Sequence, residues 1–166
     1  KSYRVASLGG APRRPATEAG DFSPSARQSS EPPEHMDNVN ITRTGRCLCG
    51  AVRFETRGAP RFISNCHCES CRRAASAPCV TWVGFLAENV TITGETLRGF
   101  ASSPGVTRSF CGACGSPIAF QGERWADETH VPACAFDDPS TLAPASDFFA
   151  EEKLPWATLL APAKPD

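Results

Sequence analysis

Near the middle of the chain stands the run Cys66-His67-Cys68-Glu69-Ser70-Cys71-Arg72-Arg73-Ala74, which gives three cysteines the spacing C-x-C-x-x-C. One pair of cysteines lies upstream in Cys47-Leu48-Cys49-Gly50, and another lies downstream in Cys111-Gly112-Ala113-Cys114-Gly115. These three clusters hold seven of the nine cysteines of the chain. Cysteines at such short spacings are typical of thiolate ligands for zinc. The count predicts two metal sites, one with four thiolates and one with three.

The two pairs of cysteines predict a closed four-thiolate site. Cys111 and Cys114 have the spacing of a zinc knuckle, in which Gly115 can take a positive φ and let backbone N–H groups point at the sulfurs. Cys47 and Cys49 lie on one face if their segment is extended, because side chains i and i+2 of a strand share a face. We expect a structural role for this site, because a saturated tetrahedral site leaves no position for a substrate.

The triad of Cys66, Cys68 and Cys71 predicts a different kind of site. Three protein ligands with one open position are the pattern of a catalytic zinc. The alternative is a second structural site that is closed by His67 or by a distant ligand such as His130. An open zinc with three thiolates suits an exogenous thiol, which it can hold as a thiolate near neutral pH. The three cysteines are therefore the candidate catalytic residues, for making or breaking a carbon–sulfur bond.

Other residues have weaker signals. Arg72 and Arg73 follow the triad and could bind a carboxylate of a thiol substrate such as glutathione, although they could equally be solvated surface. Cys79 and Cys134 lie in apolar strand contexts, so we expect them to be buried thiols. His130 is a candidate proton-transfer group, with a packed core or surface histidine as the alternative.

Composition limits the classes of protein. The length of 166 residues suits one domain. A formal net charge of −1 gives no electrostatic reason to expect nucleic acid or an acidic membrane as partner. No apolar run approaches the roughly 20 residues that a membrane span needs, so we expect a soluble, cytoplasmic protein. A disulfide framework is disfavoured because the number of cysteines is odd and they cluster at ligand spacings.

The pattern of apolar residues predicts a mostly β fold built from hairpins. Short runs rich in β-branched and aromatic residues alternate with glycine, proline and polar turns. They predict strands at 51–54, 61–64, 79–85, 90–93, 106–110, 118–120 and 130–134. Pro132 should confine the last of these strands to an edge or a bulge. The turn after Cys68, through Ala75, is the only candidate helix.

The same pattern predicts the extent of the domain. Residues 1–39 are rich in proline and serine and lack hydrophobic periodicity, so we expect a disordered N-terminal tail. Residues 40–160 are expected to form one small zinc-binding domain, and residues 161–166 a short C-terminal tail.

The cysteine clusters and their surroundings resemble the glutathione-dependent formaldehyde-activating enzymes and their relatives, which include centromere protein V. The resemblance covers roughly Thr44 to Trp156. Besides the triad, it rests on Gly45-Arg46-Cys47-Leu48-Cys49-Gly50-Ala51-Val52, on Phe110-Cys111-Gly112-Ala113-Cys114-Gly115-Ser116, on His130-Val131 through Phe136-Asp137-Asp138-Pro139, and on Leu154-Pro155-Trp156. One departure is Asp147, which stands before Phe148 where the family often has a histidine.

The resemblance implies a fold of packed β-hairpins around two Zn²⁺ ions per chain. It assigns the structural zinc to Cys47, Cys49, Cys111 and Cys114, and a second zinc, where a thiol binds, to Cys66, Cys68 and Cys71. It also implies a carbon–sulfur lyase, whose founding activity joins formaldehyde and glutathione into S-hydroxymethylglutathione.

We therefore expect a zinc-dependent carbon–sulfur lyase that acts on adducts of glutathione or a similar small thiol, with an aldehyde-type substrate. The alternatives are a non-catalytic zinc scaffold that binds protein or chromatin and a thiol-binding protein without turnover. A fourth protein ligand at the second zinc would favour the scaffold.

Overall fold

The most strongly predicted strand, 79–85, lies at the centre of the fold. In the computed structural model, which describes residues 41–158, this run forms β4 (Val80–Leu86). Four consecutive residues of β4, Trp82 to Phe85, are buried. β4 pairs antiparallel with β3 (Phe62–Cys66) on one side and with β9 (Glu128–Pro132) on the other. In a central strand that is buried on both faces, successive side chains all point into apolar surroundings. Such a strand therefore needs the continuous apolar run found here.

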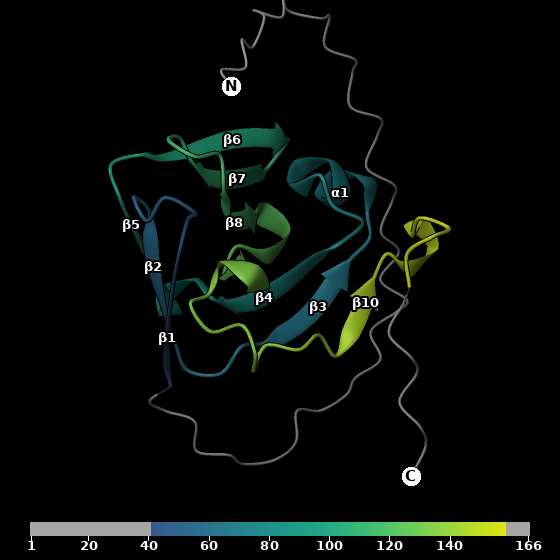
Figure 1. The fold of residues 1–166 in the computed structure, drawn as a ribbon, viewed down its shortest axis with the longest axis horizontal. Coiled ribbons are helices and arrows are strands. Elements are labelled where there is room, and N and C mark those ends of the chain that lie inside the picture. The colour runs from purple at the N-terminus through teal and green to yellow at the C-terminus, as the bar shows by residue number, and fades with distance from the viewer. Residues whose placement is uncertain (1–40, 159–166) are drawn as a thin grey trace, which may run out of the picture. The chain divides into compact units, whose positions relative to one another are not determined.

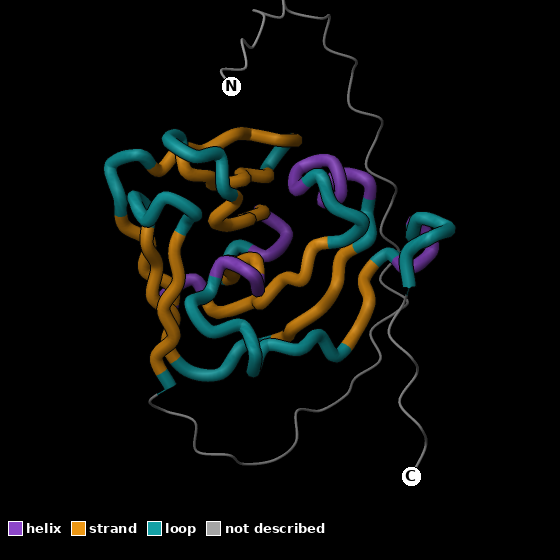
Figure 2. The backbone as a smooth tube through the Cα atoms, viewed as in Figure 1, coloured by secondary structure: helices purple, strands orange, loops and turns teal. Residues whose placement is uncertain are grey.

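These strands belong to a seven-stranded sheet with the order β10-β3-β4-β9-β8-β7-β6 (Figures 1 and 2). The other members are β6 (Leu97–Ser103), β7 (Val106–Cys111), β8 (Pro117–Gly122) and β10 (Ser146–Phe148). All neighbours are antiparallel except β10, which runs parallel to β3 along one edge of the sheet. β8 and β9 form a single ladder pair, between Phe120 and His130, although residues of both strands pack in the main core.

A second sheet contains three antiparallel strands, β1 (Thr42–Arg46), β2 (Arg53–Arg57) and β5 (Val90–Thr93), and stands at the left of Figure 1. Phe54 of β2 is buried, and so is Val52 just before this strand, as their alternation predicts. Phe54 packs edge-on against Phe136, with ring centroids 5.0 Å apart. The main core therefore lies between this sheet and the buried residues of β4, β8 and β9.

The only α-helix among the described residues is α1 (Glu69–Ala75). It begins where the Cys68 sulfur accepts a hydrogen bond from the backbone N–H of Cys71, and it ends at Ser76, which has a positive φ of 50°. Glu69 in its first turn and Arg73 in its last turn match the helix dipole. Short 3₁₀ turns complete the fold: η2 (Ala87–Asn89), η3 (Glu123–Trp125), η4 (Ala133–Ala135) and η5 (Ala150–Glu152).

The prediction of a mostly β fold is confirmed, with shifts at the strand ends. β9 is not an edge strand, because it lies between β4 and β8; Pro132 is its last residue, where a missing N–H costs the ladder little. The expected burial of two thiols was wrong: Cys134 is exposed in η4, and Cys79 is half-buried just before β4. The predicted tails, residues 1–39 and 161–166, lie outside the described residues. No helix in the described part of the chain is long and apolar enough to cross a membrane.

Candidate metal centres

The two cysteine pairs that lie far apart in sequence meet in space. The sulfurs of Cys47, Cys49, Cys111 and Cys114 all lie within 4.8 Å of one another, and we call them the tetrad. The Cys47 and Cys49 sulfurs are 3.5 Å apart, and those of Cys49 and Cys111 are 3.8 Å apart. Four sulfurs bound tetrahedrally at about 2.3 Å from a zinc ion would be about 3.8 Å apart, whereas a disulfide is about 2.05 Å long. The tetrad therefore has the spacing of a thiolate metal site, and all nine cysteines are free of disulfides.

The backbone around the tetrad supplies hydrogen-bond donors to the sulfurs. The segment from Cys47 is a turn, not the extended segment that we expected: Gly50 has a φ of 77° and donates its N–H to the Cys47 carbonyl at 3.0 Å. This turn lets the N–H of Val52 reach the Cys47 sulfur at 3.2 Å. At the other pair, hydrogen bonds from Ser116 lower the pKa of Cys114 to about 5. These donors favour the thiolate forms that metal binding requires.

The triad forms where β3 passes into α1. Cys66 ends β3, Cys68 caps the helix and Cys71 lies in its first turn, so a strand end and a helix start place three sulfurs within 4.8 Å of one another. The Cys66 and Cys68 sulfurs are 3.5 Å apart, again the spacing of ligands to one metal ion. Cys66 and Cys71 are buried, and Cys68 is half-buried. Hydrogen bonds from the Cys66 and Cys68 thiols, with the nearby Arg108 cation, hold the pKa of Cys71 far below its usual range.

Neither histidine that we considered as a fourth ligand joins the triad. Among residues 41–158, no histidine, aspartate or glutamate places a ligand atom within 4.8 Å of all three sulfurs. His67 instead directs Nε2 at Asp147, 2.8 Å from Oδ1. His130 directs Nε2 at Glu128, 2.7 Å from Oε2. The described residues thus offer four candidate ligands at the tetrad and three at the triad.

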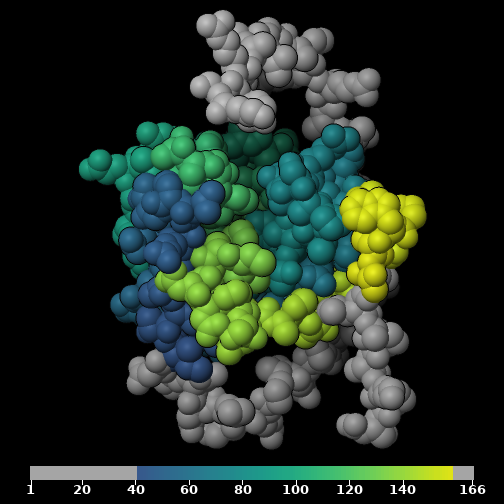
Figure 3. All heavy atoms as spheres, viewed as in Figure 1, coloured from purple at the N-terminus to yellow at the C-terminus, as the bar shows by residue number. Residues whose placement is uncertain are grey.

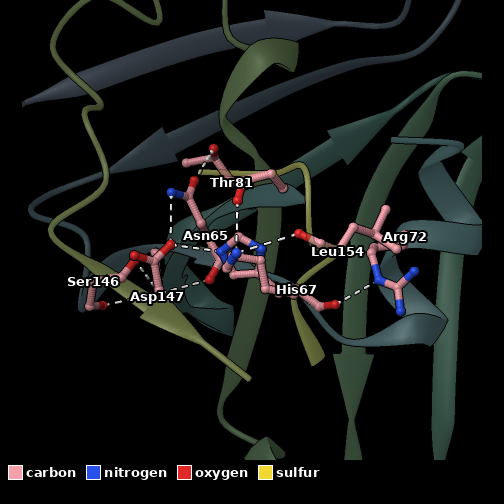
Figure 4. Close-up of polar contacts among 10 residues, drawn as sticks. Asn65, His67, Arg72, Thr81, Ser146, Asp147 and Leu154 are labelled. Carbon is pink, nitrogen blue, oxygen red and sulfur yellow. Dashed lines mark hydrogen bonds and ion pairs between the residues drawn. The ribbon is translucent and has the colours of Figure 1, made fainter. Parts of the chain in front are cut away.

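The buried His67, between two triad cysteines, is fixed by a network of half-buried polar side chains that sequence analysis did not predict (Figure 4). Its partner Asp147 comes from β10 and also accepts a hydrogen bond from Asn65 at 3.2 Å. The Thr81 hydroxyl in turn donates to the side-chain oxygen Oδ1 of Asn65 at 2.7 Å. β3, β4 and β10 each contribute a side chain, so this network exists only after the three strands have paired.

The backbone of His67 is held as firmly as its side chain. Its N–H donates to the carbonyl of Phe148 at 3.0 Å, and its carbonyl accepts from Nε of Arg72 at 2.8 Å. Arg72, predicted to bind substrate, thus also secures the loop that carries Cys66 and Cys68.

We expect Asp147→Ala to lower the free energy of unfolding by about 3 kcal/mol, because it leaves the buried His67 and the half-buried Asn65 without their acceptor, and each orphaned donor costs about 1–3 kcal/mol. Urea unfolding followed by circular dichroism measures the loss. The matched control is Asp138→Ala, which removes an exposed carboxylate bonded to Ser140 and should cost clearly less. Equal losses in the two variants would show that the His67 network contributes no more than a surface turn.

Arg108 of β7 is the second residue that sequence analysis missed. Its Nη2 lies 3.6 Å from the Cys71 sulfur and 3.2 Å from the Ser70 hydroxyl. Its guanidinium carbon lies 5.1 Å from the centroid of the Phe120 ring. No local motif signals this contact, because 37 residues separate Arg108 from Cys71.

Apolar side chains form the wall of the triad. Trp82 packs with Cys66 and Cys71 in a cluster to which Phe62, Val80 and Phe120 also belong. Phe120 stacks on His130, with ring centroids 5.4 Å apart. This wall lowers the local dielectric constant around the sulfurs and so strengthens charge interactions there.

An open groove of about 390 Å³ runs along α1, the helix that carries Cys71. It is lined by Glu69, Arg72, Arg73, Ser76, Ala77, Pro78, Leu154 and Trp156. Figure 3 shows the C-terminal end of the described segment, in yellow, against the teal region that contains α1. Trp156 is 70% exposed, and Arg73 pairs with Glu69 at 2.7 Å. The structure therefore places both predicted substrate-binding arginines on this groove, while no triad cysteine lines it.

Comparison with known proteins gives consistent results. A model of the family described as glutathione-dependent formaldehyde-activating enzyme matches residues 42–152. A Halomonas elongata protein named "Putative glutathione-dependent formaldehyde-activating enzyme" is 31% identical over an alignment of 126 residues that covers 69% of this chain and 79% of that protein. A Schizosaccharomyces pombe protein named an uncharacterized lyase is 33% identical over 76 residues, which are 46% of this chain and 55% of that protein. A crystal structure of a Rhodobacter sphaeroides protein, 20% identical, covers 63% of this chain and 98% of its own with a TM-score of 0.52, a likeness of fold alone.

Proposed function

Because this chain belongs to the glutathione-dependent formaldehyde-activating enzyme family, we propose that it is a zinc-dependent carbon–sulfur lyase acting on adducts of glutathione or a similar small thiol. The observation that carries the proposal is the triad, whose three sulfurs lie within 4.8 Å of one another without a fourth ligand from residues 41–158. Three protein ligands are the pattern of a catalytic zinc, whereas the four ligands of the tetrad are the pattern of a structural one.

Each site is assigned a separate role. Cys47, Cys49, Cys111 and Cys114 would hold a structural zinc, and Cys66, Cys68 and Cys71 a second zinc. When bound at the triad, zinc supplies a centre that stabilises an incoming thiol as its thiolate near neutral pH. The chain contributes the apolar wall of Trp82 and Phe120, which limits the access of water to the reacting sulfur.

The proposed reaction joins a thiol and an aldehyde. The thiol proton leaves for solvent, the sulfur forms a bond to the carbonyl carbon, and the π electrons of the C=O bond move to the oxygen, which takes up a proton. With formaldehyde and glutathione the product is S-hydroxymethylglutathione. The reverse reaction breaks the same carbon–sulfur bond, so no oxidant or reductant is needed.

Arg72 and Arg73 are proposed to bind a carboxylate of the thiol substrate. Both line the groove along α1, the helix that also carries Cys71, so a long thiol could place its sulfur at the triad and a carboxylate in the groove. Arg73 is the freer of the two for this task, because its side chain is 78% exposed and its only described partner is Glu69 on the same helix.

We expect Arg73→Gln to raise the KM for glutathione about 3- to 10-fold with little change in kcat, because it removes a charge-assisted hydrogen bond that is the same in the ground and transition states. Steady-state kinetics with glutathione and with 2-mercaptoethanol, which has no carboxylate, test this expectation. The KM for 2-mercaptoethanol should not change. Arg57→Gln, on the smaller sheet and paired with Glu55, is the matched control. A parallel rise in both KM values would contradict carboxylate recognition by Arg73.

The test of the proposed function is the rate at which ¹³C-formaldehyde exchanges with its glutathione adduct, measured by NMR exchange spectroscopy. The expected result is exchange faster than the uncatalysed rate, with two zinc ions per chain by native mass spectrometry. Glutathione binding without faster exchange would favour a thiol-binding protein over an enzyme. Two zinc ions without glutathione binding would favour a zinc scaffold, and either result would overturn the lyase.

A further inference from the structure

The cation beside the triad has an unusual set of partners. The three described contacts of the Arg108 guanidinium are with the Cys71 sulfur, the Ser70 hydroxyl and the Phe120 ring. Its Nε is buried and has no hydrogen-bond partner among the described residues. Within that part of the chain it forms no ion pair with a carboxylate, whereas Arg61 and Arg73 do. The positive charge of Arg108 therefore faces the triad, and no acidic side chain of residues 41–158 neutralises it.

The tetrad is surrounded differently. Its sulfurs interact with the hydroxyls of Thr96 and Ser116 and with the backbone N–H of Val52, which are all neutral groups. Among residues 41–158, an arginine donates a hydrogen bond to a sulfur only at the triad. A cation is thus placed beside the metal site that has only three protein ligands.

The difference in charge has a chemical consequence. Three thiolates and a divalent metal ion form a net negative centre, and a fourth thiolate would add a further negative charge. Because the apolar side chains of Trp82 and Phe120 pack around the triad, this added charge is screened far less there than in water. A guanidinium within hydrogen-bond distance of a ligand sulfur offsets it, but gives no comparable benefit to a neutral fourth ligand.

We infer that Arg108 makes the triad selective for an anionic fourth ligand, such as a substrate thiolate, over a neutral one. This inference rests on the proposed function, because it requires a metal ion at the triad with one position for an external ligand. Arg108 acts through the ligand sulfur of Cys71, so we regard it as a positioning residue that sets ligand specificity.

The test uses the full chain loaded with Co²⁺, whose visible absorption reports the ligands of the triad. The absorption of Co²⁺ at the tetrad cancels in the difference spectrum, because its four sulfurs leave no position for a probe. 2-Mercaptoethanol serves as the anionic probe and imidazole as the neutral probe. In Arg108→Gln, we expect the affinity for 2-mercaptoethanol to fall about 10-fold and the affinity for imidazole to change by less than about 2-fold. Arg108→Lys, which keeps the charge, should recover most of the thiol affinity.

Two further variants keep the test decisive. If the glutamine variant loses metal or folds poorly, Arg108→Met takes its place, because methionine retains an apolar stem over Phe120. We expect it to show the same selective loss of affinity for 2-mercaptoethanol. Arg98→Gln, on the neighbouring β6, removes a guanidinium that donates to the Glu95 and Leu97 carbonyls and should leave both affinities unchanged.

The possible outcomes separate the two proposals. Equal weakening of both probes in the uncharged variants, or no change in either, would overturn selectivity by Arg108 while leaving the lyase proposal intact. If the wild-type protein binds neither probe at the triad, the external-ligand position itself is wrong, and the proposed function and this inference fall together.

Discussion

Replacement of Cys71 by alanine should lower kcat/KM by at least about 10³-fold and reduce the metal content from two ions per chain to one. Cys71 is buried and supplies one of the three sulfurs of the triad, so its loss would leave two sulfurs, too few to retain an ion. Metal catalysis supplies several kcal/mol of transition-state stabilisation, and each 1.4 kcal/mol corresponds to about a tenfold change in rate. The measurements are formaldehyde–glutathione exchange by NMR and zinc by native mass spectrometry.

Cys79→Ala is the matched control for this variant. Cys79 is a half-buried free thiol that belongs to neither the tetrad nor the triad, so its loss should leave zinc content and activity unchanged. The assignment of the catalytic site would be wrong if Cys71→Ala kept full turnover with a single zinc ion per chain.

Replacement of Cys111 by serine should have the largest effect on stability, with loss of the cooperative unfolding transition. Cys111 is fully buried in the tetrad, where its sulfur lies 3.8 Å from that of Cys49 and 3.5 Å from the Thr96 hydroxyl. A structural zinc contributes about 10–16 kcal/mol of apparent binding free energy. This is as large as the whole stability of a typical domain, about 5–15 kcal/mol. Thermal unfolding by circular dichroism would detect the change, and a strong chelator should reproduce it in the wild-type protein.

Cys134→Ser provides the comparison for Cys111→Ser. The exposed Cys134 lies outside both the tetrad and the triad, and its substitution should change the free energy of unfolding by less than about 0.5 kcal/mol. A Cys111→Ser protein that melts cooperatively at the wild-type temperature would exclude a structural role for the tetrad.

The features predicted from sequence are those encoded by neighbouring residues. The triad could be predicted because six positions hold all three of its cysteines, and β4 because an unbroken apolar run is typical of a covered strand. The helix was foreseen only as the turn after Cys68, since its N-cap is a thiol and not one of the usual capping residues. β6 was missed because most of its residues are exposed and it lacks an alternating apolar pattern.

Long-range partners could not be predicted in this way. Asp147 reaches His67 from a position 80 residues later, through a three-residue parallel strand with no strong pattern of its own. Arg108 reaches Cys71 because β7 and α1 come together in the folded chain. Both contacts depend on strand pairing, and a single sequence gives no information on which distant strands will pair.

The tetrad and the triad also differ in the length of the loop that a bound metal ion would close. The triad spans a few residues, so its cysteines can capture an ion while the rest of the chain is still unfolded. The tetrad joins residues 62 positions apart, and a metal ion there acts as a cross-link between the β1–β2 and β7–β8 hairpins. By the chain-entropy relation for cross-links, closing a loop of this length lowers the conformational entropy of the unfolded chain, at a free-energy cost of about 4 kcal/mol. An ion at the tetrad would therefore bind only after the hairpins have docked, so under the proposed assignment the structural metal would enter late in folding and the catalytic one could enter first.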